Sequence, residues 1–430
     1  MRPLRAGGRP GARQRPLPLA GGPPAGGKGR ERAVRRPMSG PQRFLLAGSF
    51  LITLGSFAVL PYMSVLLHQR LGLGIGTVGL VLAVASLIQF AGGAVAGPVT
   101  GRIGLRRSML LALALRTAGF AAFVPGLRSP VLAVGALLLV SAGAALYLPA
   151  NKAYLVDGAA EAQRPRLLSA SGSAFNAGMA LGPAAAAPLV MGSPGVLFSC
   201  VTVLFALVGA AHALLPRSAA GQPPAPPPPV APVRDAAAPP PGPSPFLATA
   251  VSVYAFMFFQ HYLALYAVPR TSAGFYGAVL TGYAALLVVA QPLLAERVSA
   301  LSHPRALRWG FGAMAAGMAA IAGGGHVGIA AGAVLLCLGE IVLFLKNDLE
   351  ALARAGSSLP AAVFGRQRLA AGLGAFVSGV AGGQLYGAAE AAGSARAFWA
   401  ALCLQCLLLP VLLLRRRAAR SRPGPRRGAP

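Results

Sequence analysis

Long apolar runs constrain this chain more than any other feature of its sequence. A helix needs about 20 apolar residues to cross the hydrocarbon core of a bilayer, where only helices and closed barrels can satisfy their backbone groups. The runs do not alternate polar and apolar residues, as the strands of an outer-membrane barrel would. They therefore predict an all-α integral membrane protein with twelve transmembrane helices, at about residues 44–67, 74–96, 108–126, 130–150, 168–191, 195–215, 246–268, 273–295, 307–325, 327–345, 369–388 and 395–414.

The composition agrees with a membrane protein. Of the 430 residues, 55% are hydrophobic and 11% are charged, whereas a soluble domain is about 25% charged. This low charge excludes an ordinary soluble enzyme, and the long apolar runs exclude an intrinsically disordered chain. The formal net charge of +29 is typical of a nucleic-acid binder, but the positions of the basic residues favour another explanation.

The basic residues gather between alternate pairs of apolar runs. With twelve spans and the N-terminus inside, 33 of the 38 Lys and Arg residues fall on the cytoplasmic side, while Arg70, Arg128, Arg270 and Arg396 fall outside. This is the positive-inside pattern. We therefore expect a multi-pass protein of the inner (plasma) membrane with both termini cytoplasmic. Its positive charge would contact anionic lipid headgroups, with no nucleic acid as a partner.

The segments outside the apolar runs divide the chain into domains. Residues 1–43 are basic, lack the apolar core of a secretory signal and are expected to be disordered, and Met38 is a candidate for the true start. Residues 216–245 are Pro-rich, which is typical of an extended cytoplasmic linker, and residues 415–430 form a basic cytoplasmic tail. We expect six-helix bundles at residues 44–215 and 246–414.

The two halves resemble each other weakly. Arg166 and Gly172 in the first half have counterparts 200 residues later in Arg366 and Gly372. Two of the three lysines, at positions 152 and 346, also follow corresponding spans. Such internal symmetry is typical of transporters whose halves arose by duplication, so the two bundles are expected to be pseudo-symmetric.

A glycine-rich motif follows the second apolar run. The sequence GPVTGRIGLRR contains Gly97 and Gly101 one helical turn apart, Arg102, Gly104 for a tight reversal, and Arg106 at the cytoplasmic surface. The motif resembles the loop signature G-x-x-x-D-R-x-G-R/K-R/K of the major facilitator superfamily (MFS). Gly101 stands where the family has an aspartate. In the family this carboxylate makes a charge contact between the second and eleventh spans at the gate, and a glycine cannot make it.

A second motif lies in the fifth apolar run, at Gly178, Gly182 and Pro183. We expect Gly182–Pro183 to bend the helix and to present a smooth face to a helix of the other half. These residues resemble part of the antiporter signature G-x-x-x-G-P-x-x-G-G. Over about residues 40–415, the chain resembles the 12-span drug/proton antiporter branch of the superfamily, which implies the MFS fold and export in exchange for protons.

Two ionisable residues within the apolar runs are candidates for proton coupling or substrate binding, because such groups are costly in hydrocarbon and usually functional. Glu340 is the one carboxylate well inside a run, and it precedes Lys346 by six residues, or about 9 Å of helix. We expect a proton acceptor or cation site there, and a structural hydrogen bond is the alternative. His261, beside Gln260, titrates near physiological pH, although a packing histidine is the commoner outcome.

Aromatic and neutral polar residues extend the candidate site. The rings in the seventh run could bind flat, greasy or cationic molecules by stacking and cation–π contacts, or they could face the lipid or pack in the core. Arg116 in the third run is expected to have a structural partner. These further candidates are the aromatic residues Tyr254, Phe256, Phe258, Phe259, Tyr262 and Tyr266, and the amides Gln89, Asn176 and Gln291.

Motifs for other kinds of chemistry are missing from the sequence. It has no P-loop for a nucleotide, and no catalytic or metal-binding set stands at a suitable spacing. The four cysteines, Cys200, Cys337, Cys403 and Cys406, all lie in apolar runs and fit neither a disulfide framework nor a zinc site. We therefore expect no enzyme activity, no metal and no cofactor, and an ion gradient as the energy source.

These features together predict a monomeric secondary active transporter. It would export small amphipathic molecules or drugs in exchange for protons, by alternating access between two six-helix bundles. One alternative is an MFS importer or metabolite carrier. Another, of a different class, is a non-transporting membrane sensor or scaffold on the same fold, which the glycine at position 101 supports.

Overall fold

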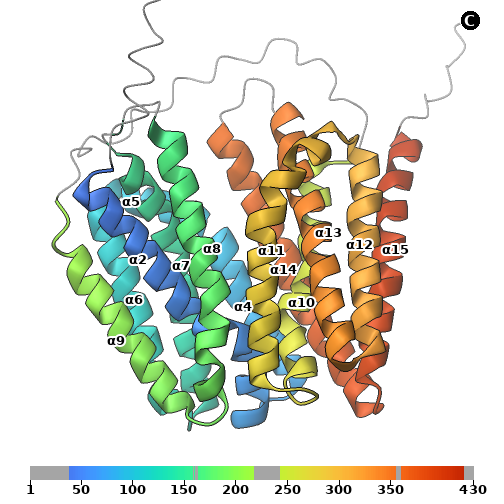
Figure 1. Ribbon diagram of the computed structural model, residues 1–430, viewed down its shortest axis with the longest axis horizontal. Helices are drawn as coiled ribbons and strands as arrows, with labels where there is room; N and C mark the ends of the chain where they lie inside the picture. Colours follow the sequence, from blue (N-terminus) through green and yellow to red (C-terminus); the bar gives the residue numbers. More distant parts are fainter. Residues whose placement is uncertain (1–37, 158, 160–162, 217–242, 355–359, 421–430) are drawn as a thin grey trace, which may run out of the picture.

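The computed structural model describes residues 38–157, 159, 163–216, 243–354 and 360–420, and this part of the chain is helical without a β-strand (Figure 1). The all-α fold predicted from the apolar runs is therefore confirmed. Residues 1–37, 217–242 and 421–430, where a disordered segment, a linker and a tail are predicted, lie outside the described residues. The proposed domain boundaries stay predictions.

The first half of the bundle begins where the sequence carries a helix start signal. The Ser39 hydroxyl accepts a hydrogen bond from the backbone N–H of Gln42, and the Gln42 side chain accepts one from the N–H of Ser39, which is a capping box. The first span continues past α2 through short 3₁₀, α and π segments. The elements are α2 (Gly40–Val59), η1 (Leu60–Tyr62), α3 (Met63–Val65), η2 (Leu66–Arg70), α4 (Ile75–Ala91), α5 (Gly93–Ile103), α6 (Leu105–Gly126), α7 (Pro130–Val156), α8 (Arg164–Val190) and α9 (Pro194–His212).

The second half contains six long helices beside the first half (Figure 1). Several extend beyond the predicted apolar spans, and α13, which continues to Arg354, is an example. The elements are α10 (Pro245–Ala267), α11 (Ala273–Ala300), α12 (His303–Gly323), α13 (Gly325–Arg354), α14 (Pro360–Ala391) and α15 (Ala395–Arg420).

Every predicted span overlaps a helical segment, with α2 to η2 forming the first and α4 with α5 the second. In the described residues, nine helices are long and apolar enough to cross a membrane, and the bent pair α4–α5 would make ten. Helices α8 and α12 are 27 and 21 residues long but are not among them, since both carry glycines and polar residues between their apolar ones. The structure thus supports a multi-pass membrane protein, and the count of twelve stays a prediction.

The two halves meet mainly through α4 with α14 and α8 with α11. Small residues make the α4–α14 crossing close. A Cβ added at Gly79 would lie 2.5 Å from the carbonyl oxygen of Gly379 and 2.7 Å from the Cα of Gly383. Small residues allow this approach between membrane helices. The glycines of α4 and α14 therefore permit the short distance between the two halves at this crossing.

Candidate functional site

Glu340 lies on α13, half-buried inside the second half of the bundle. The Tyr283 hydroxyl of α11 donates a hydrogen bond to its Oε2 atom. Among the described residues no Lys or Arg forms an ion pair with this carboxylate. The group therefore has one neutral donor as its partner, and it can accept a proton without breaking a salt bridge.

Aromatic rings and a thiol surround Tyr283. The ring of Phe259 on α10 lies 5.4 Å from that of Tyr283, and the ring of Phe256 lies 6.4 Å away in a stacked arrangement. Phe344 on α13 contacts Phe256 edge-on at 5.5 Å. The Cys337 thiol lies 3.7 Å from the backbone oxygen of Tyr283. These contacts fix the position of the tyrosine and give Glu340 a largely apolar neighbourhood.

His261 lies on another face of α10 and joins the two halves. It is 7% exposed, and its Nε2 atom is 3.0 Å from the hydroxyl of Ser86 on α4. Its Nδ1 atom has no hydrogen-bond partner in the described part of the structure. The neighbouring Gln260 is half-buried. The structure therefore gives His261 and Glu340 separate hydrogen-bond partners on different helices.

The two tyrosines proposed for substrate binding pack inside the second half. The Tyr254 hydroxyl donates to the side-chain oxygen of Gln405 on α15 at 3.1 Å, and the Tyr262 hydroxyl donates to the backbone oxygen of Gly379 on α14 at 2.6 Å. Phe258, on the same face, contacts Phe398. This face of α10 thus packs against α14 and α15, whereas Phe256 and Phe259 face Tyr283 and Glu340.

The remaining polar candidates divide by burial. Gln89 and Asn176 are half-buried, and Gln291 is exposed. Arg116 is buried at 4% exposure; its guanidinium donates to the Ser56 hydroxyl and lies 4.7 Å from the ring centre of Phe205. Arg116 therefore has structural partners on α2 and α9 of its own half.

The loop motif after the second span surrounds the turn between α5 and α6. Gly104 has φ +84°, a conformation that favours glycine, and Arg106 donates to the backbone oxygen of Ala213 at the end of α9. Gly97, Gly101 and Arg102 are exposed, and a Cβ added to either glycine would meet no atom within 4 Å. The motif thus forms the predicted tight turn, and its glycines stand free of a neighbouring helix in this conformation.

Both glycines of the antiporter-like motif pack within their own half, so the expected face toward the other half is wrong for Gly182. A Cβ added at Gly178 would lie 2.6 Å from the backbone oxygen of Phe50, and one at Gly182 would lie 2.7 Å from that of Leu54. Both contacts are on α2. The reason is the rotation of α8 about its axis. The side of α8 that contacts the second half carries Ala180 and Pro183 instead of the two glycines.

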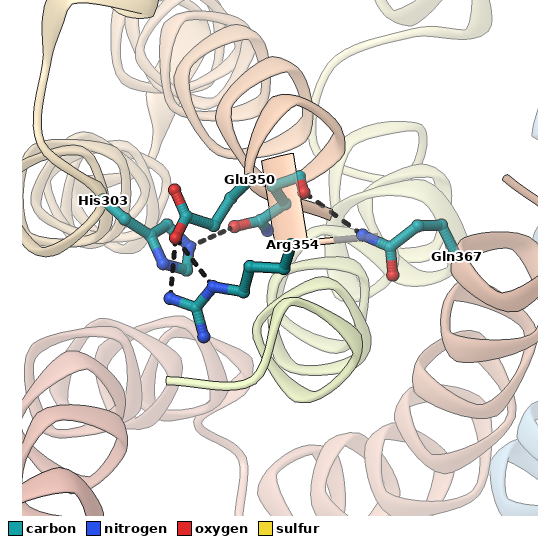
Figure 2. Close-up of polar contacts among 5 residues, drawn as sticks. His303, Glu350, Arg354 and Gln367 are labelled. Carbon is teal, nitrogen blue, oxygen red and sulfur yellow. Dashed lines mark hydrogen bonds and ion pairs between the residues drawn. The ribbon is translucent and has the colours of Figure 1, made fainter. Parts of the chain in front are cut away.

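A polar cluster without any signal in the sequence lies where the start of α12 meets the last part of α13 (Figure 2). The Nε2 atom of His303 is 3.0 Å from the side-chain oxygen of Asn347, and the Gln367 amide donates to the backbone oxygen of Asn347 at 3.2 Å. Next to them, Arg354 forms an ion pair with Glu350 at 2.6 Å. The cluster ties α12, α13 and α14 together.

The first half contains a matching polar contact. Asn347 on α13 donates to the hydroxyl of Ser252 on α10 at 3.1 Å, and Asn151 on α7 donates to the hydroxyl of Ser49 on α2 at 2.8 Å. Helices α7 and α13 are the fourth and tenth spans, and α2 and α10 are the first and seventh. The two asparagine–serine contacts therefore fit the internal repeat predicted from the sequence.

Other kinds of site find less support. Among the residues that the structure describes, no group of three or more His, Cys, Asp or Glu side chains could hold a metal ion. The four cysteines are free.

Comparisons with known proteins agree with this architecture. The sequence profile of the Major Facilitator Superfamily matches residues 45–345. An uncharacterized MFS-type transporter of Mycobacterium tuberculosis is 31% identical over 152 residues, which cover 35% of this chain and 36% of the relative. The multidrug resistance protein MdtH of Aeromonas hydrophila is 30% identical over 126 residues, covering 29% and 32%. The chain thus spans about a third of the length of these curated relatives.

Solved structures share the fold over nearly the whole chain. A point mutant of the peptide transporter POT superposes with a TM-score of 0.70 at 14% identity, over 91% of this chain and 98% of that one. A point mutant of the nucleoside transporter NupG gives 0.67 at 12% identity, over 89% and 100%. At such low identity the likeness concerns the fold alone.

Proposed function

This chain belongs to the Major Facilitator Superfamily, and we propose that it exports small amphipathic molecules or drugs in exchange for protons. In this proposal the two halves rock about a central site and open it alternately to each side of the membrane. The chain acts as a monomer in the inner membrane with both termini in the cytoplasm. Its basic cytoplasmic segments contact anionic lipid headgroups.

The observation that carries the proposal is the environment of Glu340. Its partner is the neutral Tyr283, and Phe256 and Phe259 pack around that tyrosine. An ionisable group at such a depth is costly and is usually kept for function. A carboxylate with a single neutral donor can exchange its proton as its access to water changes, which is what coupling to a proton gradient requires.

The proposed cycle uses this carboxylate as the proton carrier. A proton that enters from the outside binds Glu340 and neutralises it, which weakens its attraction for a cationic or polar substrate and favours release outside. The halves then reorient, and the proton leaves toward the cytoplasm, where the proton concentration is lower. The recharged carboxylate can then take part in binding the next substrate molecule.

Two further observations support an amphipathic substrate. Flat rings lie near the carboxylate, and aromatic faces bind greasy or cationic molecules by stacking and cation–π contacts. In addition, one of the relatives is named a multidrug resistance protein. His261, at the contact with Ser86 between the halves, is proposed as a second group that responds to protons.

Dye accumulation in a host without its own efflux pumps tests the function. Cells that express the chain should accumulate less ethidium than cells with the empty vector, and collapsing the proton gradient should abolish the difference. Increased uptake of a single nutrient from a metabolite panel would instead indicate an importer. No change in either assay, with the protein present in the membrane, would favour the sensor or scaffold alternative that Gly101 suggests.

A further inference from the structure

We propose that Tyr62 and Tyr276 form a reciprocal clasp that holds the two halves together at the outer end of the transporter and must open in each transport cycle. The outer end is the end near the loops at residues 71–74 and 268–272, which the proposed topology places outside the cell. The proposal rests on the alternating access described above, and it assigns the positions that control access to the outside.

The clasp consists of two hydrogen bonds that cross between the halves in opposite directions. The Tyr62 hydroxyl in the first half lies 3.1 Å from the backbone oxygen of Ala273 in the second half. The Tyr276 hydroxyl in the second half donates to the backbone oxygen of Pro61 in the first half at 3.1 Å. Each tyrosine therefore binds the backbone beside its partner.

The two rings also contact each other directly. Their centres lie 5.1 Å apart at an interplanar angle of 76°, the edge-to-face geometry that aromatic pairs prefer. Tyr62 is 0% exposed and Tyr276 is 1% exposed. Both rings are therefore shielded from solvent in this conformation, and in the proposal their contact closes the outer end.

Local structure places both tyrosines for this contact. Pro61 has no N–H and interrupts the α-helical hydrogen bonding, so the first span continues beyond α2 as the 3₁₀ turn that ends at Tyr62. On the other side, the Ser272 hydroxyl accepts a hydrogen bond from the N–H of Phe275 and caps the start of α11. That first turn carries Ala273 and Tyr276.

A glycine and the antiporter-like motif make the approach possible. A Cβ added at Gly277 would lie 2.9 Å from the Tyr62 hydroxyl and 3.0 Å from the backbone oxygen of Pro183. The single hydroxyl proton of Tyr62 is shared between that oxygen, at 2.9 Å, and the backbone oxygen of Ala273. Tyr62 therefore stays attached to α8 of its own half when the halves separate, whereas the Tyr276 bond exists only in the closed state.

Further contacts extend the closure toward the middle of the bundle. One turn beyond Gly277, the Thr281 hydroxyl donates to the backbone oxygen of Ala180 at 2.5 Å. Gly79 of α4 and Gly379 of α14 are in close contact on the other side of the interface. The structure is thus a conformation closed at the outer end, with the tyrosine clasp nearest the outer surface.

Accessibility of a thiol from outside tests the clasp without any substrate. Thr281→Cys, in a chain whose four cysteines are replaced by alanine, places a reporter just inside the clasp. With Tyr276→Phe, its labelling by a membrane-impermeant maleimide added outside should rise about fivefold, since one buried hydrogen bond of ordinary net strength shifts an equilibrium by about that factor. Tyr62→Phe should act in the same direction, and the double variant should exceed either single one.

A matched tyrosine serves as the control. The Tyr154 hydroxyl on α7 donates to the backbone oxygen of Pro216, just after α9, at 2.6 Å, so Tyr154→Phe removes a similar hydrogen bond without touching the contact between the halves. Labelling should stay unchanged in this variant. Equal labelling in the Tyr276→Phe and Tyr154→Phe variants would overturn the clasp.

Hydrogen–deuterium exchange provides a second measurement in the chain with its native cysteines. The amides of residues 273–281 should exchange faster in Tyr276→Phe than in the wild-type chain, and unchanged exchange would contradict the clasp. Both measurements are independent of proton coupling. Suppose that proton-driven transport does not depend on Glu340, even though the outer end opens in the clasp variants. In that case the proposed function would fail and the clasp would stand.

Discussion

The hydroxyl of Tyr283 donates a hydrogen bond to the carboxylate of Glu340, across the contact between α11 and α13. The sequence identifies Glu340, because a carboxylate inside an apolar run is rare. It gives no comparable signal for Tyr283, which stands 57 positions earlier among many aromatic residues. The pair is the structural basis of the proposed coupling, and it leads to the first prediction.

Replacing Tyr283 by phenylalanine should slow proton-driven exchange without abolishing it. The ring still packs on Phe256 and Phe259, while the carboxylate loses one hydrogen bond, so we expect a rate about fivefold lower, which corresponds to about 1 kcal/mol. Dye efflux from vesicles with an imposed pH gradient measures the rate. Tyr154→Phe, which removes a hydroxyl remote from Glu340, is the control; equal rates in the two variants would argue against a role for Tyr283.

The crossing of α4 and α14 should tolerate no side chain at Gly79. Gly79→Ala places a Cβ 2.5 Å from the backbone oxygen of Gly379, and overpacking of this kind costs about 1–3 kcal/mol. We expect lower thermal stability in detergent and slower transport. Gly282→Ala is the matched control, because a Cβ at Gly282 would meet nothing within 4 Å. A Gly79→Ala protein as stable as the control would show that this contact is not needed.

The two asparagine–serine contacts should contribute similarly to stability. Asn151 and Asn347 are 2% and 1% exposed, and truncating either to alanine leaves a buried serine hydroxyl without its donor. Such losses cost about 1–3 kcal/mol. Thermal unfolding in detergent should therefore show a clear drop for both variants. Asn176→Ala, at a half-buried position, should change stability less; a drop as large in Asn176→Ala would contradict this interpretation.

Acid should weaken the polar cluster around His303, which precedes the predicted span at residues 307–325. Burial lowers the pKa of His303 from its usual value of 6.5. The nearby Lys346 and Arg354 also lower it, while Asn347 and Glu350 act in the opposite direction. The lowered pKa means that the folded state favours neutral His303. Its stabilising contribution is therefore complete above pH 6.5 and is lost as the pH falls from there toward the lower pKa of the folded state.

Thermal unfolding measured between about pH 8 and about pH 5 checks this expectation. The wild-type chain should lose stability below about pH 6.5, the ordinary histidine pKa, and His303→Gln should lose less over the same range. His326→Gln, at an exposed position, is the control for the removal of a histidine as such. The prediction fails if His303→Gln and the wild-type chain respond to acid equally.

The helical fold is well predicted from the sequence because hydrocarbon permits few alternatives to a helix. The resemblance of its Gly97–Arg106 motif to a family signature was sufficient to indicate the superfamily, which the profile match over residues 45–345 confirms. The number of membrane spans is harder to predict from the sequence than the helical fold. The reason is that α8 and α12 contain glycines and polar residues, which lower their mean hydropathy.

Side-chain partners are less predictable from one sequence. Tyr254 and Tyr262 share a helical face, and only the fold shows that this face packs on α14 and α15. The glycines of the antiporter-like motif face α2, because their orientation depends on the rotation of α8 about its axis. The partners Ser86 and Tyr283 lie far in the sequence from His261 and Glu340, so contact between them requires the three-dimensional structure.

Proton-driven transport by the Glu340→Gln variant in reconstituted vesicles tests the central claim most directly. Glutamine keeps the size and polarity of the side chain but cannot carry the proton. The matched control is Glu390→Gln, at an exposed carboxylate near the end of α14. We predict that an imposed pH gradient drives ethidium transport by the wild-type chain and by Glu390→Gln, and that Glu340→Gln transports no more than protein-free vesicles. Undiminished proton-driven transport by Glu340→Gln would contradict the account.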